Sequence, residues 1–415
     1  MLRVRPYLRL SLKLYEYQAI GKPIICCAAG QPAARARYSS EQYMAKRFLI
    51  VGYYGWKNTG DDAMLYGILS ELQRLYPTTR IAVVTVAPIE IPKSKNGKNL
   101  VYFVKPSPYT VFWELCKSST LILGGGSHFE DFGSKRIRPL KNTLRILTLI
   151  IFAKLLKKKV CLLGIGISPV SSVLIKWMLK LIFHLADFIS VRDKVSLEFL
   201  KLLREDRKAL LAFDPSALIM PFPYSHPNKE TSDITLGISV LPAFKIYYGA
   251  EKIDLFLVDC IARELNSWAA ENPYLKVLLF VFKGKSKDDD VSLTMQLQKK
   301  LYATQRVKFV PYEPNPRKRL QQVSQCDYFI AMRFHSSMFA YLNRIPLLMI
   351  DYHPKCRALA EYIGLPKNAI VSPSEILSGK FGMLLKHFRE YPNEFLASLP
   401  VEIAKQKARL GLNSL

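Results

Sequence analysis

The stretch that decides the fold is Tyr328-Phe329-Ile330-Ala331-Met332-Arg333-Phe334-His335-Ser336-Ser337. Its first four residues predict a short buried strand, and the apolar residues that follow recur at helical spacing. Arg333 and His335 therefore lie where a strand ends and a helix begins, and we expect Ser336 or Ser337 to be the N-cap. In a parallel α/β sheet such a junction lies at the carboxyl edge of the strands, where ligands bind.

A fixed cation, an imidazole and the positive end of a helix meet at this junction, a combination that suits a small, multiply charged anion. The alternative is that Arg333 pairs with a carboxylate of the core and His335 is a structural histidine. The other segments of the chain favour the anion site.

Strands and helices alternate along most of the chain. We expect strands at 48–52, 81–86, 100–104, 120–123, 160–164 and 188–191, and again at 235–240, 277–282, 307–310, 328–331 and 347–350. A proline-rich stretch at 221–227 is the expected linker. The pattern predicts an α/β protein with two Rossmann-like, doubly wound parallel-sheet domains that face a cleft.

The predicted domain limits follow from this alternation. Residues 1–46 form a basic extension that we expect to be poorly ordered, and we predict an N-terminal Rossmann-like domain at 47–222 on the acceptor side. The C-terminal Rossmann-like domain is predicted at 223–372 on the donor side, followed by a helical tail at 373–415. Three interpretations of the extension stay open: a transit-like peptide, an arm that touches a membrane, and an incorrect start.

The chain of 415 residues carries a formal charge of +27. This excess favours an anionic substrate or membrane surface over nucleic acid, because the cations are not gathered in one tract and no aromatic platform interleaves with them. Seven cysteines without a C-x-x-C pair indicate neither a zinc site nor a disulfide framework, a pattern typical of the cytoplasm. From this cysteine pattern we predict a cytoplasmic protein. No apolar run reaches the length needed to span a bilayer.

Glycines follow three of the predicted strands. The segment from Gly52 to Ala63 carries Asp61 and Asp62 at the expected helix start, where either alone could be a simple cap. Gly124-Gly125-Gly126 could form a nest of N–H groups for an oxyanion or an ordinary tight turn, and it lacks the Lys-Ser/Thr of a P-loop. Gly164-Ile165-Gly166 is interpreted as a packing turn.

Two further segments carry cations at strand ends. Arg192 in Ser190-Val191-Arg192-Asp193 could pair with Asp193 or reach the same anion as Arg333, since guanidinium groups bind carboxylate and phosphate in a bidentate manner. Lys355, after another predicted strand, is a further cation of the cleft or a surface residue. Asp214-Pro215 is interpreted as a packing turn.

Together these segments resemble the polysaccharide pyruvyl transferase family. The resemblance covers about residues 47–372 and is carried, in the family's order, by 55–63, 124–126, 164–166, 190–193, 214–215, 332–335 and 351–355. It implies a two-domain fold of the GT-B type and transfer of pyruvyl from phosphoenolpyruvate to a sugar of a cell-surface polymer, often lipid-linked. It maps the donor-binding residues onto Arg192, Arg333 and His335, and the phosphate-side loop onto Gly124, Gly125 and Gly126; Phe334 departs from the family's usual leucine.

The residue chemistry agrees with this resemblance, because phosphoenolpyruvate carries a carboxylate and a phosphate on one small frame. We hypothesise that His335 is the general acid that protonates the methylene carbon, and that Asp61 or Asp62 accepts a hydroxyl proton or orients the sugar. We expect Lys355 to bind substrate, and the chemistry to need no cofactor and no metal. The alternatives are a GT-B glycosyltransferase that uses a nucleotide sugar, and a non-catalytic protein that binds membrane or nucleic acid.

The expected partners are phosphoenolpyruvate and a glycan or lipid-linked glycan, without nucleic acid. A lipid-linked acceptor would bring the protein to the inner membrane face. The predicted helix at 173–186, with Lys176, Trp177 and Lys180, could touch that membrane, although we favour packing of this helix against the core.

Overall fold

The computed structural model of the chain describes residues 46–92, 100–129, 137–168, 170–220, 233–286 and 288–413. Residues 1–45 of the predicted extension and the predicted linker at 221–227 lie outside these ranges.

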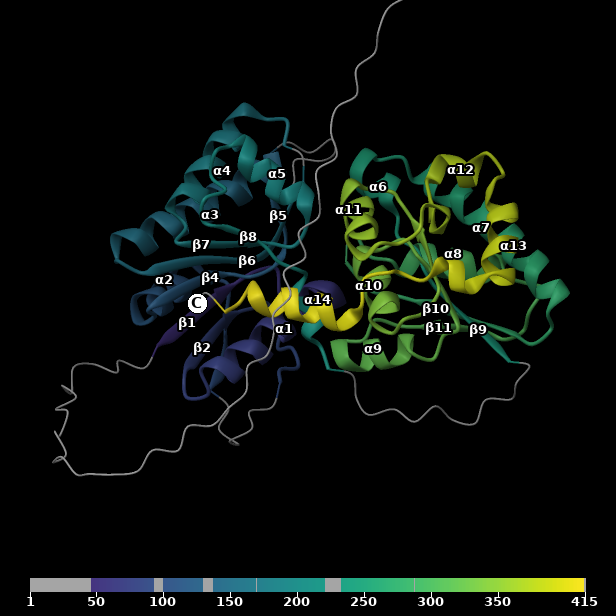
Figure 1. Ribbon diagram of the computed structural model, residues 1–415, viewed down its shortest axis with the longest axis horizontal. Helices are drawn as coiled ribbons and strands as arrows, with labels where there is room; N and C mark the ends of the chain where they lie inside the picture. Colours follow the sequence, from purple (N-terminus) through teal and green to yellow (C-terminus); the bar gives the residue numbers. More distant parts are fainter. Residues whose placement is uncertain are drawn as a thin grey trace, which may run out of the picture. The chain divides into compact units, whose positions relative to one another are not determined.

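The first sheet contains eight parallel strands (Figure 1). They are β1 (Arg47–Val51), β2 (Arg80–Val84), β3 (Val101–Val104), β4 (Thr120–Leu123), β5 (Gly126–Phe129), β6 (Lys159–Ile167), β7 (Phe188–Val191) and β8 (Ala209–Leu211). Their order is β3-β2-β1-β4-β6-β7-β8, and β5 pairs with β6. Helices cover both faces, so the central strands are continuous apolar runs, as in β4.

The second sheet repeats this arrangement with six parallel strands. They are β9 (Ile234–Ser239), β10 (Leu275–Phe280), β11 (Val307–Val310), β12 (Tyr328–Ala331), β13 (Leu347–Ile350) and β14 (Ile370–Val371), in the order β11-β10-β9-β12-β13-β14. In each sheet the first and fourth strands along the chain are neighbours, which is the Rossmann order. The predicted fold class, two parallel-sheet α/β domains, is confirmed.

Six helical segments belong to the first sheet: α1 (Thr59–Leu75), α2 (Pro108–Lys117), α3 (Ile137–Leu155), α4 (Val173–Leu185), α5 (Lys194–Leu202) and the 3-10 turn η1 (Pro215–Leu218). Helices α2 to α5 share one hydrophobic core with one face of the sheet. Helix α1 and η1 cover the other face, and their core continues into that of the second sheet.

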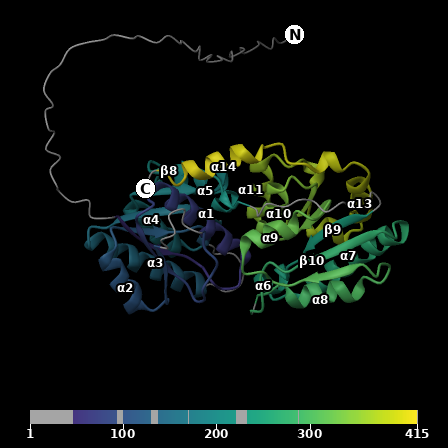
Figure 2. The ribbon, with the colours of Figure 1, turned by 90° about the horizontal axis from the view of Figure 1, so that it is seen from below.

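The remaining helical segments are α6 (Ala243–Tyr248), α7 (Glu251–Glu271), α8 (Val291–Lys300), α9 (Pro316–Val323), α10 (Phe334–Leu342), α11 (Pro354–Ile363), η2 (Lys367–Ala369), α12 (Pro373–Leu377), α13 (Phe381–Glu390), η3 (Pro392–Phe395) and α14 (Val401–Leu410). Helices α12 and α13 pack on α7, whereas α14 packs on η1 and lies along the upper edge of the ribbon in Figure 2. Gly411 lies so close to Ala212 that a Cβ there would be 2.6 Å from the alanine methyl.

Three local expectations are wrong. Helix α10 begins at Phe334, so Arg333 is the N-cap, and the hydroxyls of Ser336 and Ser337 donate to the Arg333 carbonyl from inside the helix, at 2.8 and 3.2 Å. The two serines precede the apolar helical run in the sequence, which favours them as caps. In the structure, Phe334 and His335 already belong to the first turn of α10, so the cap lies before them.

The second correction concerns Gly164-Ile165-Gly166, which is not a turn, because β6 continues to Ile167. The register of β6 and β7 shifts there, and Gly164 has a φ of +60° with Pro215 in the place of a Cβ. The glycine therefore forms a bulge inside a strand.

The third correction concerns the start of α1. Asn58 is the N-cap, and its side chain accepts from the Gly60 N–H at 3.3 Å. Asp61 and Asp62 lie in the first turn, where a carboxylate still interacts favourably with the helix dipole.

Candidate active site

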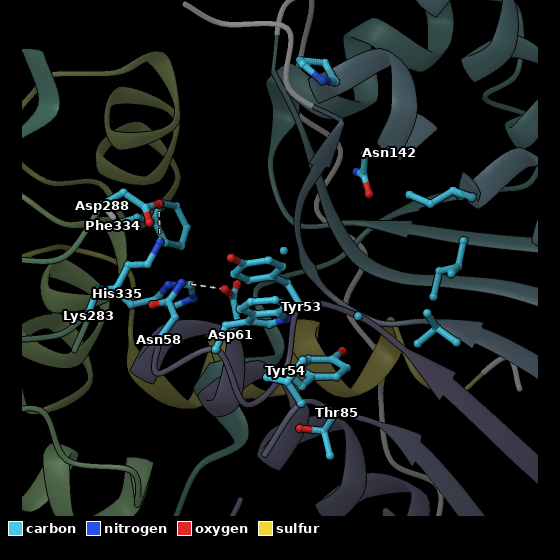
Figure 3. Close-up of a pocket in the computed structure, with 18 of the residues that line it drawn as sticks. Tyr53, Tyr54, Asn58, Asp61, Thr85, Asn142, Lys283, Asp288, Phe334 and His335 are labelled. Carbon is cyan, nitrogen blue, oxygen red and sulfur yellow. Dashed lines mark hydrogen bonds and ion pairs between the residues drawn. The ribbon is translucent and has the colours of Figure 1, made fainter. Parts of the chain in front are cut away.

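A cavity of about 670 Å³ lies at the carboxyl ends of the strands of both sheets (Figure 3). Its lining comes from the loops after the central strands: Gly52, Tyr53, Tyr54, Trp56, Asn58 and Asp61 after β1, Gly126 after β4, Arg192 after β7, Leu241 after β9, Arg333, Phe334 and His335 after β12, and Tyr352 and Lys355 after β13. Strands β1 and β4, and likewise β9 and β12, mark the point where the strand order reverses. Parallel α/β proteins bind ligands at such points.

The cavity is lined by more cations than carboxylates. The cations are Lys141, Arg145, Arg192, Lys283, Arg333 and Lys355, and the carboxylates are Asp61 and Asp288. A concave site with this balance concentrates anions.

A buried carboxylate, Asp214, joins two of the predicted site residues. Its Oδ2 is 3.1 Å from Arg192 Nη1 and 3.6 Å from His335 Nε2, and its Oδ1 accepts from the Ser216 N–H at 2.9 Å. Burial alone would raise the pKa of Asp214, but the interactions with His335, Arg192 and Ser216 outweigh it and hold the pKa well below its usual range. Asp214 is therefore a buried anion that faces both Arg192 and His335.

Arg192 is 4% exposed, and its guanidinium lies 4.3 Å from the centre of the Phe334 ring, within the range of a cation–π contact. A Cβ at Gly166 would be 2.6 Å from Arg192 Nε. The missing side chain in β6 therefore leaves room for the arginine. The sequence alternative, a pair with Asp193, is present at a longer distance of 3.8 Å.

Arg333 is held by Asp290, which is fully buried. The Nε atom of Arg333 lies 2.6 and 2.7 Å from the two carboxylate oxygens of Asp290, and Nη2 of Arg333 lies 2.5 Å from Oδ1 of Asp290. Asp290 also accepts from the backbone N–H groups of Phe282 and Lys283. The core carboxylate named in the alternative interpretation exists, yet Arg333 also lines the cavity. A guanidinium has five N–H donors, so pairing fixes its direction without using all of them.

His335 packs against the first turn of α1. A Cβ on Gly60 would overlap the imidazole at Nδ1, so only glycine allows this approach. On the other side of the ring, Nε2 faces Asp214. The histidine is thus fixed between two elements of the first sheet although it is carried by the second.

Asp61 and Asp62 have different surroundings. Asp61 lines the cavity, and its Oδ2 accepts from Asn58 Nδ2 at 2.5 Å, as the dashed line in Figure 3 shows. Asp62 lies behind it, where Oδ1 accepts from the Gly55 N–H at 2.9 Å and Oδ2 from the Tyr312 hydroxyl at 3.3 Å. Burial raises the pKa of Asp62 to about 7.

The three consecutive glycines also differ from one another. Gly124 donates its N–H to Val51 O in the sheet and packs against Tyr54, and Gly125 packs against Met64. Only Gly126, with a φ of +132°, lines the cavity. The structure therefore explains two of the glycines by close packing.

Sequence reasoning missed three residues that shape the site. Asp214 was noted but interpreted as a packing turn, and Asp290 gave no signal within the acidic run 288–290. Lys283 lines the cavity and pairs with Asp288. Its backbone forms a bridge with Asn58, and Thr59 donates to Phe282 O at 3.0 Å. These contacts join the loop after β1 to the loop after β10.

Within the part of the chain that the structure describes, no group of three or more His, Cys, Asp or Glu side chains could hold a metal ion.

Solved structures similar to this chain share its fold at low identity. A protein from Listeria monocytogenes assigned as a UDP-N-acetylglucosamine 2-epimerase superposes with a TM-score of 0.57 at 9% identity, covering 88% of this chain and 94% of that one. The UDP-GlcNAc 2-epimerase from Neisseria meningitidis, solved with UDP-GlcNAc, gives 0.55 at 10% identity over 89% and 98%. The enzyme from Methanocaldococcus jannaschii gives 0.52 at 12% identity over 88% and 99%. These likenesses show a GT-B-like fold.

Comparison with curated protein sequences finds no match. Comparison with protein families matches residues 58–354 to polysaccharide pyruvyl transferase. The match spans most of the chain, from the N-cap of α1 to the start of α11, and includes Arg192, Asp214, Arg333 and His335. This chain belongs to the polysaccharide pyruvyl transferase family.

Proposed function

We propose that this protein transfers the pyruvyl group of phosphoenolpyruvate to two hydroxyls of one sugar in a cell-surface polysaccharide or its lipid-linked precursor. The observation that carries the proposal is the arrangement around Asp214, which aligns Arg192 and His335 at a cavity lined by an excess of cations. Family membership supplies the class of reaction.

The donor would be bound by Arg192 and Arg333. Phosphoenolpyruvate has two anionic groups, and guanidinium groups bind carboxylate and phosphate through paired N–H donors. Lys355 and the loop at Gly126 would add a cation and a close backbone approach on the same side. The buried partners Asp214 and Asp290 fix both guanidinium groups in advance, which lowers the entropy lost on binding.

His335 would act as the general acid. It gives its proton to the methylene carbon, and C2 becomes an oxocarbenium centre that the first sugar hydroxyl attacks. The bond between C2 and the bridging oxygen then breaks, and phosphate leaves with that oxygen and the electron pair of the bond. The second sugar hydroxyl attacks C2 and closes the ketal. Of the two hydroxyl protons, one restores His335 and the other leaves with phosphate. The anion Asp214 stabilises the imidazolium needed at the first step.

Asp61 lines the cavity, and the other lining carboxylate, Asp288, pairs with Lys283, so Asp61 would accept the hydroxyl proton or orient the sugar. Asp62 would position this segment through Gly55 and Tyr312. Tyr53 and Trp56 stack at 5.2 Å with planes 7° apart and also line the cavity. Aromatic faces of this kind suit the apolar face of a sugar ring. The proposed chemistry uses no cofactor, and a lipid-linked acceptor would place it at the cytoplasmic membrane face.

The test is incubation of the full chain with isotope-labelled phosphoenolpyruvate and a panel of glycan and glycolipid acceptors. We expect phosphate release that depends on the acceptor and a product heavier by one labelled pyruvyl unit. His335→Gln should abolish both, while Tyr302→Ser, on the far surface beside α8, should leave both unchanged. Transfer of a sugar from a nucleotide sugar, without reaction of phosphoenolpyruvate, would refute the proposal.

A further inference from the structure

Helices α3 and α4 expose large apolar side chains on their outer faces. On α3, Leu144, Ile151, Phe152 and Leu155 are exposed and recur at intervals of one helical turn or two. On α4, Val173, Leu174 and Trp177 are exposed, and Trp177 is 72% exposed. The inner face of α4 carries the buried residues of the core, so core packing, favoured from the sequence, accounts for only one side of this helix.

The apolar surface continues onto α2. Tyr109, Phe112 and Trp113 are exposed there, and Phe112 meets Phe152 of α3 edge to face at 5.7 Å. Helices α3 and α4 contact each other along their length, and Figure 2 shows the three helices close together on the first sheet. Soluble proteins rarely expose apolar patches as continuous as this one unless something binds there.

The charges around the patch are mostly positive. Residues 132–186, which include all of α3 and α4, contain no Asp or Glu. Lys176 and Lys180 flank Trp177 on α4, and Lys157 and Lys158 follow the end of α3. Lys154, in the last turn of α3, pairs with Asp187, which follows α4. On α2 the acidic residue Glu114 is buried and pairs with Lys117 and Arg47.

We infer that the outer faces of α2, α3 and α4 form a docking surface for an anionic lipid bilayer. Exposed Trp, Leu and Phe beside lysines are the composition of surfaces that enter the interface of anionic membranes. In a symmetric dimer, this cationic face would pack against the same face of a second copy of the chain, and the like charges would repel each other. Nucleic acid fits less well because the exposed rings of the patch are interrupted by aliphatic side chains, such as Leu155, Val173 and Leu174, on which a base cannot stack.

The position of α3 links this surface to the active site. Lys141, Asn142, Arg145, Ile146 and Leu149 of the same helix line the cavity. A bilayer on the outer face of α3 would therefore lie beside the cavity where a lipid-linked acceptor must enter. Of the helices in the described part of the chain, none is long and apolar enough to cross a membrane, so binding would be peripheral.

Co-sedimentation of the full chain with vesicles tests this inference. We expect binding to vesicles of phosphatidylcholine with phosphatidylglycerol, and much weaker binding to phosphatidylcholine alone. The variant Lys176→Gln/Lys180→Gln should bind about tenfold or more weakly, since each lysine near an anionic surface contributes roughly fivefold. Leu174→Ser/Trp177→Ser should also lose binding, whereas Met383→Ser on α13, which is equally exposed, should not.

Quenching by brominated phosphatidylglycerol shows whether these helices enter the lipid. We expect quenching of tryptophan fluorescence in the wild type and its loss in Trp113→Phe/Trp177→Phe, while Trp56 and Trp268 remain. Unchanged vesicle binding by the α4 variants would overturn the inference, since the contact would then lie elsewhere, as in the basic N-terminal residues. A dimer in light scattering that Leu174→Ser/Trp177→Ser dissociates, or stronger binding to RNA than to vesicles, would also overturn it. Binding is measured without turnover, so its failure leaves pyruvyl transfer standing.

Discussion

Replacing Asp214 with asparagine tests whether one buried carboxylate holds both Arg192 and His335. The change keeps the Oδ1 acceptor for the Ser216 N–H but removes the charge that faces Arg192 and His335. Arg192 is 4% exposed and Asp214 is fully buried. Loss of one partner from a buried ion pair costs about 3–5 kcal/mol, because the remaining charge is uncompensated. This is a large part of a typical total stability of about 5–15 kcal/mol.

Chemical denaturation of Asp214→Asn, Arg192→Met and the double variant measures this effect. We expect the double variant to be more stable than the sum of the single losses predicts, by at least about 1 kcal/mol, since it removes both charges. The deficit of Asp214→Asn should be complete at neutral pH and shrink as the pH falls below about 4. The reason is that the unfolded chain binds a proton at Asp214 below about pH 4, whereas the folded state, with its lowered pKa, stays ionised, so the stabilisation by this charge is lost progressively as the pH falls toward the folded-state pKa. Additive losses, or a deficit that does not change with pH, would refute the coupling.

Three further predictions concern single residues. Gly60→Ala should reduce kcat/KM by about 100-fold, because the new methyl group displaces His335. The free energy of unfolding should change by no more than about 1 kcal/mol. Steady-state kinetics and chemical denaturation measure the two quantities, and a variant with wild-type activity would contradict the prediction. Asp62→Asn should be more stable than the wild type at pH 8 but not at pH 4. Burial raises the pKa of Asp62 to about 7, so between pH 4 and pH 7 the folded state keeps a proton that the unfolded chain has released. The stability of the wild type therefore falls as the pH rises through this range, whereas that of Asp62→Asn does not. Free energies of unfolding of both proteins between pH 4 and pH 8 test this prediction. Arg333→Lys should raise the KM for phosphoenolpyruvate at least about tenfold, because an ammonium cannot keep the bidentate pair with Asp290; an unchanged KM would exclude Arg333 from donor binding.

The fold was predictable because its signals are local. Apolar runs such as 120–123 and 328–331 mark strands buried on both sides, and their alternation with helices leaves few topologies open. The short strands β8 and β14 were missed, because segments of two or three residues carry little periodicity. Helix α2 was missed because its exposed face is apolar as well, which blurs the helical pattern. Strand β5 was missed because it begins at the last of three consecutive glycines, which favour a turn.

The site was predictable as a set of candidates but not as an arrangement. Arg192, Arg333, His335 and Asp61 reach one cavity because parallel strands end at the same edge. Their partners come from distant positions, and neither Asp214 nor Asp290 stands in a pattern that names its contact. The split between Asp61 and Asp62 depends on the entry angle of α1, which the cap at Asn58 sets.

The central claim is that the cavity binds phosphoenolpyruvate through Arg192 and Arg333 and that His335 protonates it. Transfer carried out in D₂O measures this directly, because the proton delivered to the methylene carbon comes from solvent through the imidazole. We predict that the wild type makes a pyruvyl ketal whose methyl group carries one deuterium, and that His335→Gln binds the donor but makes no product. Product formation by His335→Gln at the wild-type rate, or a product without deuterium in its methyl group, would contradict the account.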